Sequence, residues 1–213
     1  LKGYVLGASS FSSGPDAPIS RQGTAGGGAS TNAAFVCGGN APSPTSAGQT
    51  TTIEYDGTNW ASGGAMSNAR RATSGAGTLT AGLAVAGGNT PPFNSTLTAC
   101  EEYDGSSWTA GGALNAQRTS HAAWGTQSAG CMSGGEVTAS PSVAGNTEEY
   151  DGSSWTVTNP LNTSRQNNCA LGTQTAGLFI GSGPPGKLVE QYNGSTWTAV
   201  NELAQPSTSG FSA

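Results

Sequence analysis

Adjacent carboxylates and a lone histidine are the groups in this chain whose types and spacing come nearest to catalytic chemistry. Glu101-Glu102 and Glu148-Glu149 stand side by side, and glycoside hydrolases use a pair of carboxylates as acid and base. Neighbours on a strand point to opposite faces, so these pairs are not expected to act together. His121 is the one histidine, and no serine lies in a nucleophile-elbow sequence that would complete a triad. The sequence therefore predicts no catalytic residue and a protein that is not an enzyme.

Metal and cofactor sites are not expected either. The four cysteines, at positions 37, 100, 131 and 169, form no CxxC pair, and a single histidine cannot complete a zinc site with them. Alternating acids of a calcium loop are absent, and GGG at 26–28 lacks the Lys-Ser/Thr of a phosphate-binding loop. We interpret the cysteines as small buried apolar residues.

Composition and charge narrow the possible partners. A formal charge of −5 with only seven Lys and Arg residues argues against nucleic-acid binding, which needs clustered positive charge. No apolar stretch reaches the roughly 20 residues that span a bilayer, so membrane insertion is not expected. With 34 glycines, 9% charged residues and regularly spaced apolar runs, the chain reads as all-β with many tight turns.

The elements that position these residues come from an internal repeat. EEYDGSSW occurs at 101–108 and again at 148–155, and looser copies are IEYDGTNW at 53–60 and EQYNGSTW at 190–197. The first three tryptophans are 48 and 47 residues apart, and the fourth follows 42 residues later. A catalytic signature normally appears once in a chain, whereas a string that recurs at intervals indicates architecture.

Each repeat contains an aromatic pair and an arginine at fixed positions. An arginine follows each of the first three tryptophans by ten residues, and a Gly-Gly after an apolar run comes later in the unit. Phe11 lies 49 residues before Trp60 and has its own arginine ten residues on, so it is a worn copy of the tryptophan. The predicted structural anchors are Phe11, Tyr55, Trp60, Tyr103, Trp108, Tyr150, Trp155, Tyr192, Trp197, Arg21, Arg70, Arg118 and Arg165.

The unit divides into four short strands. The first strand follows the arginine, and the second is the apolar run before the glycines. The third carries the Glu-Glu-Tyr and the fourth carries the Trp. Asp-Gly between the last two predicts a two-residue hairpin turn with positive φ at both positions. Four strands in about 47 residues predict a blade of a β-propeller, with each Tyr and Trp buried against the next blade.

The predicted fold is one propeller domain over residues 1–213. It is expected to close with a fifth blade that the two chain ends share. ASSF at 8–11 copies GSSW, and NELAQPSTSGFSA resembles GALNAQRTSHAAW without its arginine. A second strand of this blade is expected beyond Ala213, and a fragment of a larger ring is the alternative. The predicted ranges are 1–19 for strands of the closing blade, 20–66, 67–114, 115–161 and 162–203 for four blades, and 204–213 for the start of the closing blade.

These units resemble kelch-type propellers in their Arg-led first strand, Gly-Gly after the second strand, and Tyr followed by Trp. EEYDGSSWTAGGALNAQRTS and LGTQTAGLFIG resemble kelch-like repeats in structural proteins of marine tailed phages, cyanophages included. The resemblance implies a virion or extracellular protein, such as a tail fibre, appendage or decoration subunit. Its expected partners are other virion proteins and host-surface glycans, with homo-oligomers possible. An intracellular interaction module and a glycan-processing enzyme with convergent arginines stay open as alternatives.

One face of the predicted propeller varies while the other is constant. Loops between the second and third strands share a face with the connections between blades, and they differ widely: NAPSPTSAGQTT, NTPPFNSTL, EVTASPSVAGN and PPGK. The Asp-Gly hairpins on the opposite face barely change, which is the usual division between recognition and support. The predicted binding residues on the variable face are Asn40, Asn89, Phe93, Asn94, Glu136, Asn146 and Lys187.

Overall fold

The computed structural model describes residues 14–40, 47–88, 96–137, 142–182 and 186–207. These residues form four antiparallel sheets of four strands each and one two-stranded sheet, and none of them is helical. No helix among them is therefore long and apolar enough to cross a membrane.

Each sheet is one blade, and its strands lie side by side in chain order. Blade 1 lies within 20–66, blade 2 within 67–114, blade 3 within 115–161 and blade 4 within 162–203. The strands of blade 1 are β1 (Gln22–Ser30), β2 (Ala33–Asn40), β3 (Thr52–Tyr55) and β4 (Trp60–Ser62). Those of blade 2 are β5 (Ser74–Thr78), β6 (Ala81–Gly88), β7 (Thr96–Tyr103) and β8 (Trp108–Ala110). Those of blade 3 are β9 (Ala122–Thr126), β10 (Ala129–Ser133), β13 (Thr147–Tyr150) and β14 (Trp155–Thr158). Those of blade 4 are β15 (Cys169–Thr173), β16 (Ala176–Ile180), β17 (Val189–Tyr192) and β18 (Trp197–Ala199), and the two-stranded sheet in blade 3 is β11 (Glu136–Val137) with β12 (Ser142–Val143).

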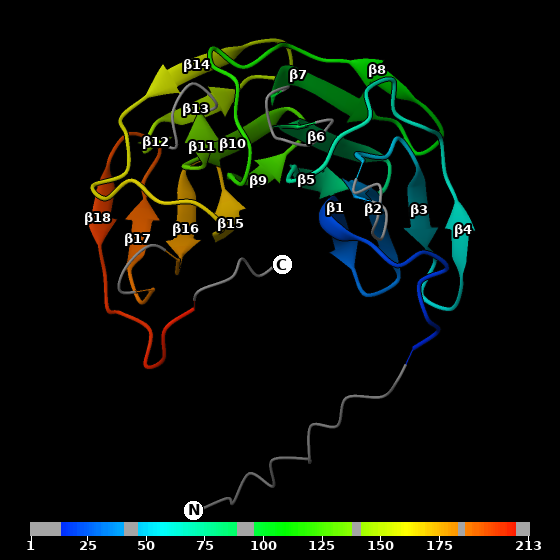
Figure 1. The fold of residues 1–213 in the computed structure, drawn as a ribbon, viewed down its shortest axis with the longest axis horizontal. Helices are drawn as coiled ribbons and strands as arrows, with labels where there is room; N and C mark the ends of the chain where they lie inside the picture. The colour runs from blue at the N-terminus through cyan, green and yellow to red at the C-terminus, as the bar shows by residue number, and fades with distance from the viewer. Residues whose placement is uncertain (1–13, 41–46, 89–95, 138–141, 183–185, 208–213) are drawn as a thin grey trace, which may run out of the picture.

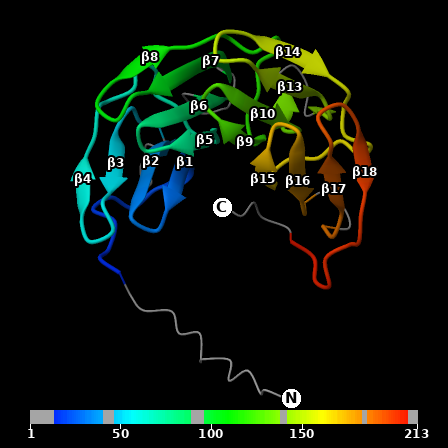
Figure 2. The ribbon, with the colours of Figure 1, turned by 180° about the vertical axis from the view of Figure 1, so that it is seen from behind.

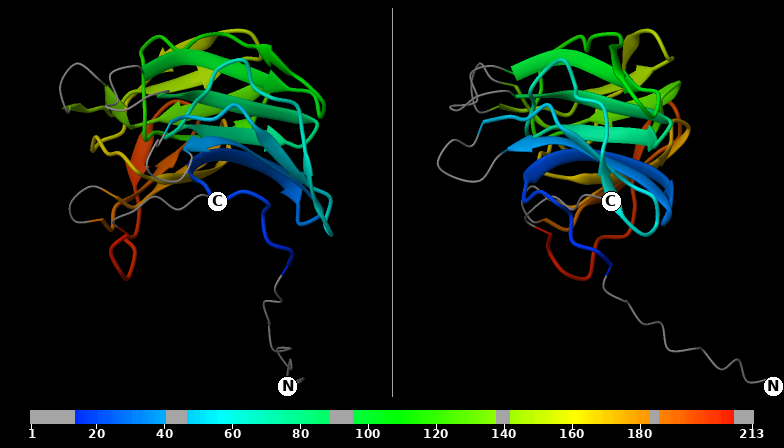
Figure 3. Two further views of the ribbon diagram at one scale, coloured as in Figure 1. Left: turned by 45° about the vertical axis from the view of Figure 1, so that its right-hand side comes forward. Right: turned by 90° about the vertical axis from the view of Figure 1, so that its right-hand side faces the viewer.

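The four blades follow one another around a common axis (Figure 1). The first strand of each blade lies at the inner edge of the arc and the fourth at the outer edge, which the reverse view also shows (Figure 2). Contacts of β1 with β5, of β5 with β9 and of β9 with β15 join the inner strands of consecutive blades. Seen from the side, the sheets are twisted layers packed face to face (Figure 3), which is the arrangement expected of blades.

The hydrophobic core lies between the blades and has three parts. Each of the three buried clusters combines residues of two consecutive blades, such as Phe35 of blade 1 with Tyr103 and Trp108 of blade 2. The four cysteines are buried and free. Because a single sheet has no core of its own, consecutive blades stabilise each other.

The all-β, four-stranded blades agree with the sequence prediction, but the predicted number of five blades does not. The described parts of the two ranges assigned to the closing blade, 14–19 and 204–207, contain no strand. The strands predicted for that blade fall on 1–13 and 208–213, which lie outside the described residues, together with Phe11. The structure thus supports four blades in an open arc, without support for a fifth (Figure 1).

The hairpin between the third and fourth strands also differs from the prediction. Tyr103 and Trp108 are paired, so the turn contains four residues and not two. Only Gly105 among the turn residues has a positive φ, of 94°. The Asp104 carboxylate accepts the backbone N–H groups of Ser106 and Ser107, each at 2.8 Å. This side-chain cap fixes the turn and replaces the second positive-φ residue of a two-residue hairpin.

Candidate functional site

The repeated aromatic pair is a wedge between blades. The rings of Tyr103 and Trp108 stack with their centroids 4.7 Å apart, and both rings approach Phe35 of the preceding blade, at 6.1 and 5.9 Å. The same pair recurs as Tyr150–Trp155 in blade 3, where the rings stack, and as Tyr192–Trp197 in blade 4, where they are tilted. These side chains are buried, and their ring packing stabilises the interface.

The second glutamate of each pair is bound to the tyrosine of the next blade. The hydroxyl of Tyr150 donates to Glu102 at 2.5 Å, and that of Tyr192 donates to Glu149 at 2.8 Å. Tyr103 donates in the same way to Glu54. Burial, with the bond to the carboxylate, raises the pKa of Tyr150 to about 12.

The first glutamate of each pair holds the connection into its own blade. Glu101 forms an ion pair with Arg70 at 2.6 Å and accepts the backbone N–H groups of Ser67 at 2.7 Å and Asn68 at 3.1 Å. Burial by itself would raise the pKa of Glu101, but these backbone donors and the guanidinium together lower it below its ordinary value. The Glu190 carboxylate contacts Arg165 in the same manner.

The repeated arginines each bond within a separate blade. Arg21 donates to the carbonyl of Gly38 at 2.8 Å, and the corresponding bonds are Arg70 to Ala86 at 3.1 Å and Arg118 to Gly134 at 3.2 Å. Each acceptor has a positive φ and lies at the bend that ends the second strand. In blade 2 the two residues with positive φ at this bend are Ala86 and Gly87, one position before the Gly87-Gly88 doublet that the sequence pattern indicates. At these positions the arginine and the two neighbouring glutamates make contacts that hold the strands and blades together.

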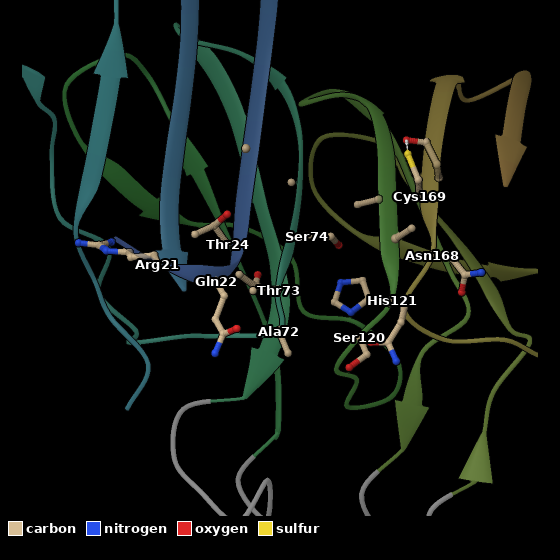
Figure 4. Close-up of a pocket in the computed structure, with 17 residues that line it drawn as sticks. Arg21, Gln22, Thr24, Ala72, Thr73, Ser74, Ser120, His121, Asn168 and Cys169 are labelled. Atoms are coloured by element: carbon tan, nitrogen blue, oxygen red, sulfur yellow. Dashed lines mark hydrogen bonds between the residues drawn. The ribbon is translucent and has the colours of Figure 1, made fainter. Parts of the chain in front are cut away.

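A pocket of about 440 Å³ lies at the centre of the arc, where the first strands of all four blades begin (Figure 4). Gln22 pairs with Asn40, and Arg71 forms a bridge with Gly88, so the start of each first strand lies next to the end of the second. The pocket therefore opens on the face that carries the variable loops. Among the described residues that line it, Arg21 is the one charged side chain, and no carboxylate is present.

Several polar atoms in this pocket have no hydrogen-bond partner among the described residues. They are the hydroxyl of Ser74, the side-chain carbonyl of Asn168 and the ring nitrogens of His121, whose ring has the backbone of Val85 as a polar neighbour. Asn168 uses its amide nitrogen to donate to Gly181 at 2.5 Å, while its buried oxygen has no partner among the described residues. Burial lowers the pKa of His121 to about 3, and the positive charge of Arg118 acts in the same direction. The pocket therefore offers neutral donors and acceptors at neutral pH.

The pocket mouth is held rigid by backbone hydrogen bonds between blades. The N–H of Ser120 donates to Ala72 at 3.0 Å, and that of Asn167 donates to Ser120 at 2.9 Å. These three residues have φ of 46°, 56° and 56°, and Gly23 takes the same conformation in blade 1. Left-handed backbone at non-glycine residues costs about 1 kcal/mol each, so the surrounding packing enforces it.

The predicted binding residues that the structure describes do not line this pocket. Asn40 is buried at the end of β2, Glu136 is half-buried in β11, Asn146 is exposed before β13 and Lys187 is half-buried before β17. Asn89, Phe93 and Asn94 lie outside the described residues. None of the four described ones is among the residues that line the pocket.

Sequence reasoning missed the pocket because most of its lining residues are glycine, alanine, serine and threonine, which form no motif. One signal was available in the repeat register. The third residue after each arginine is polar, namely Thr24, Thr73, His121 and Asn168, and all four line the pocket.

Comparison with known proteins adds information on the fold. No protein-family model and no curated protein matches the chain. The solved structure of YjhT superposes on it with a TM-score of 0.71 at 12% sequence identity, over 91% of this chain and 69% of that one. With the four radial sheets described above, this decides the architecture.

The chain is a β-propeller. At 12% identity, the likeness between this propeller and YjhT extends to the fold alone.

Proposed function

We propose that this propeller is a non-enzymatic recognition module that binds a neutral, hydroxyl-rich ligand, such as a glycan, in the axial pocket and on the loop face around it. The observation that carries the proposal is the set of unpartnered polar atoms of Ser74, His121 and Asn168 at the pocket. Buried polar groups are normally hydrogen-bonded, so groups without a partner in the wall of a pocket favour a ligand whose entry lets them complete their bonds.

The chemistry of the pocket favours a sugar over a charged ligand. A neutral imidazole can both donate and accept, as can a serine hydroxyl, and sugar hydroxyls do the same. The guanidinium of Arg21 is already bonded to the carbonyls of Gly38 and Thr51, at 2.8 and 3.1 Å. Small side chains at the walls leave room for a ring of the size of a monosaccharide within about 440 Å³.

The structural contacts of the glutamates favour binding of a glycan without its hydrolysis. Glycoside hydrolysis requires two free carboxylates on either side of the scissile bond. The repeat carboxylates instead bind Arg and loop N–H groups within a blade, or a Tyr hydroxyl across blades. We accordingly assign no catalytic role to them.

The sequence resemblance supplies the proposed setting. We place the module in the kelch-like group and on the exterior of a phage particle, in a tail fibre, appendage or decoration subunit, with virion proteins and host-surface glycans as partners. Many copies on one particle would convert weak binding to each glycan into strong attachment. The same resemblance leads us to propose a ring completed by a fifth blade from the two ends of the chain.

The test is binding of the purified full chain to immobilised neutral glycans, with Asn168→Leu as a pocket variant and Asn146→Ala as a control outside the pocket. We expect the pocket variant to lose at least tenfold in affinity and the control to keep it. Binding that neither variant changes would contradict the proposed site. Release of free sugar from the bound glycans would contradict the non-enzymatic assignment, and antibody labelling of host cytosol without particles would contradict the proposed location.

A further inference from the structure

The turn between the third and fourth strands begins with asparagine in one blade and with aspartate in the other three. Asp56, Asp104 and Asp151 begin the turns of blades 1, 2 and 3, and Asn193 begins that of blade 4. A glycine follows each of them, and the four glycines have φ between 91° and 95°. Asn193-Gly194 is the one Asn-Gly dipeptide in the sequence. The four turns therefore share one conformation and differ in the group that caps them.

The side-chain oxygen of Asn193 accepts hydrogen bonds from four donors. The backbone N–H groups of Ser195 and Thr196 donate to it at 3.0 and 2.8 Å. The hydroxyls of the same two residues donate to it at 3.2 and 3.3 Å. Because a backbone N–H can only donate, the atom that it contacts is the carbonyl oxygen of the amide and not its nitrogen. We call these four donors the turn cradle; they polarise the carbonyl of Asn193 at Cγ.

The equivalent cradle in blade 3 shows which charge it favours. The Asp151 carboxylate accepts the N–H groups of Ser154 at 2.8 Å and Ser153 at 2.9 Å, together with the Ser153 hydroxyl at 2.8 Å. The N–H of Ser154 and the two donors of Ser153 lower the pKa of Asp151 to about 2. The cradle thus stabilises a negative charge on the side-chain oxygen at this position of the turn.

Negative charge develops on this oxygen of Asn193 in a reaction with the neighbouring glycine. The nitrogen of Gly194, once its proton passes to solvent base, can attack Cγ of Asn193, and the side-chain oxygen carries the charge of the adduct. Gly194 has no side chain to obstruct this approach. The bond from Cγ to Nδ2 then breaks, and Nδ2 takes a proton from water and leaves as ammonia. Asn193 is exposed, so water is present on both sides of this step.

The cyclic imide that forms is opened by water at one of two carbons. Addition at Cγ breaks its bond to the nitrogen of Gly194, restores the peptide N–H and gives aspartate. Addition at the backbone carbon breaks the peptide bond instead and gives isoaspartate, in which the main chain is one carbon longer. That extra carbon would disturb the pairing of Tyr192 with Trp197. The cradle polarises Cγ and therefore favours aspartate.

We propose that Asn193 is a self-modification site, at which the folded chain converts the amide to the aspartate that the other three turns contain. The overall reaction consumes one water and turns the amide into a carboxylate and an ammonium ion. Its product is the group that the cradle binds most strongly, because hydrogen bonds to an ionised acceptor exceed those to a neutral one. Each conversion adds one negative charge to the formal charge of −5, so the converted fraction rises with the age of the protein.

Peptide mapping of the full chain during incubation in mildly alkaline buffer tests the proposal. We expect Asn193 to convert mainly to aspartate in the folded chain, and mainly to isoaspartate in the chain unfolded by urea, where the cradle is lost. Asn159 is the internal control, since the nitrogen of Pro160 has no proton and cannot form the imide. An amide at Asn193 that persists as long as that of Asn159 would overturn the proposal. Isoaspartate as the main product of the folded chain would overturn it as well.

Two variants separate the effect of the cradle from that of the dipeptide. Asp151→Asn places Asn-Gly in the cradle of blade 3 and is expected to return to aspartate at a rate within about threefold of that at Asn193. Ser195→Ala combined with Thr196→Val removes both hydroxyl donors and is expected to slow conversion at least about threefold and to raise the share of isoaspartate. An unchanged rate and product ratio in the double variant, or a stable amide at position 151, would refute the role of the cradle.

Discussion

His121 makes the stability of this propeller depend on pH in a way that can be calculated. It is the one histidine of the chain, it is 5% exposed, and burial lowers its pKa to about 3. In the unfolded chain its pKa returns to the ordinary value of a histidine, 6.5. The unfolded state therefore binds a proton as the pH falls below 6.5, while the folded state resists protonation until about pH 3.

The sign follows from proton linkage. Because the folded pKa of His121 is depressed, the neutral ring contributes stability that is fully present above pH 6.5 and is lost progressively as the pH falls toward 3. Between pH 7.5 and pH 5 the expected loss in the free energy of unfolding is about 2 kcal/mol, at about 1.4 kcal/mol per pH unit once the unfolded ring is mostly protonated.

Urea denaturation at a series of pH values between 5 and 7.5 measures this loss. The control is His121→Thr, because threonine occupies the corresponding position in blades 1 and 2, as Thr24 and Thr73. The variant is expected to show a nearly flat profile over the same range. A wild-type profile as flat as that of the variant would refute the burial of a neutral imidazole beside the pocket.

The interface bonds give three further predictions. Tyr150→Phe removes a hydroxyl bonded to Glu102 at 2.5 Å and is expected to lower the free energy of unfolding by about 1–2 kcal/mol in urea titrations. Tyr55→Phe, at the open end of the arc, should cost less than half as much. Equal losses in the two variants would contradict the role of Tyr150 in the interface between blades. Glu101→Gln breaks the buried ion pair with Arg70 and is expected to lower the free energy of unfolding by about 3 kcal/mol in the same assay, because the guanidinium stays buried. A loss below about 1 kcal/mol would contradict the structural role of this ion pair. Asp104→Asn should leave the midpoint of thermal unfolding unchanged, since an amide oxygen accepts the same N–H groups. Asp104→Ala should lower this midpoint. Equal midpoints for the two variants would refute the side-chain cap.

The repeat register made the blades predictable from sequence. Trp108 and Tyr103 recur at fixed spacing because each interface needs the same wedge, so the period alone locates four sheets. The hydrogen-bond partners of the repeated glutamates were harder to predict. That adjacent glutamates point to opposite faces was expected, but not that Glu102 binds the tyrosine of the next blade while Glu101 binds the arginine of its own.

The candidate site could be predicted only in part. The pocket opens on the face that loop variation had singled out, yet it is built by the starts of four first strands, which converge only in three dimensions. His121 was visible as the lone histidine, but its burial depends on the neighbouring blade and is not a property of the local sequence. The hairpin prediction was wrong because a carboxylate that caps two N–H groups, as Asp104 does, allows a longer turn than Asp-Gly alone indicates.

Binding of a hydroxyl-rich ligand in the axial pocket is tested most directly by the NMR signals of the His121 ring during titration with a neutral glycan that the chain binds. As the chain has one histidine, its imidazole nitrogens give an unambiguous reporter inside the pocket. The ring signals are expected to shift in proportion to the bound fraction while the imidazole stays neutral. Saturable binding that leaves these signals unchanged would place the ligand elsewhere and contradict the proposed site.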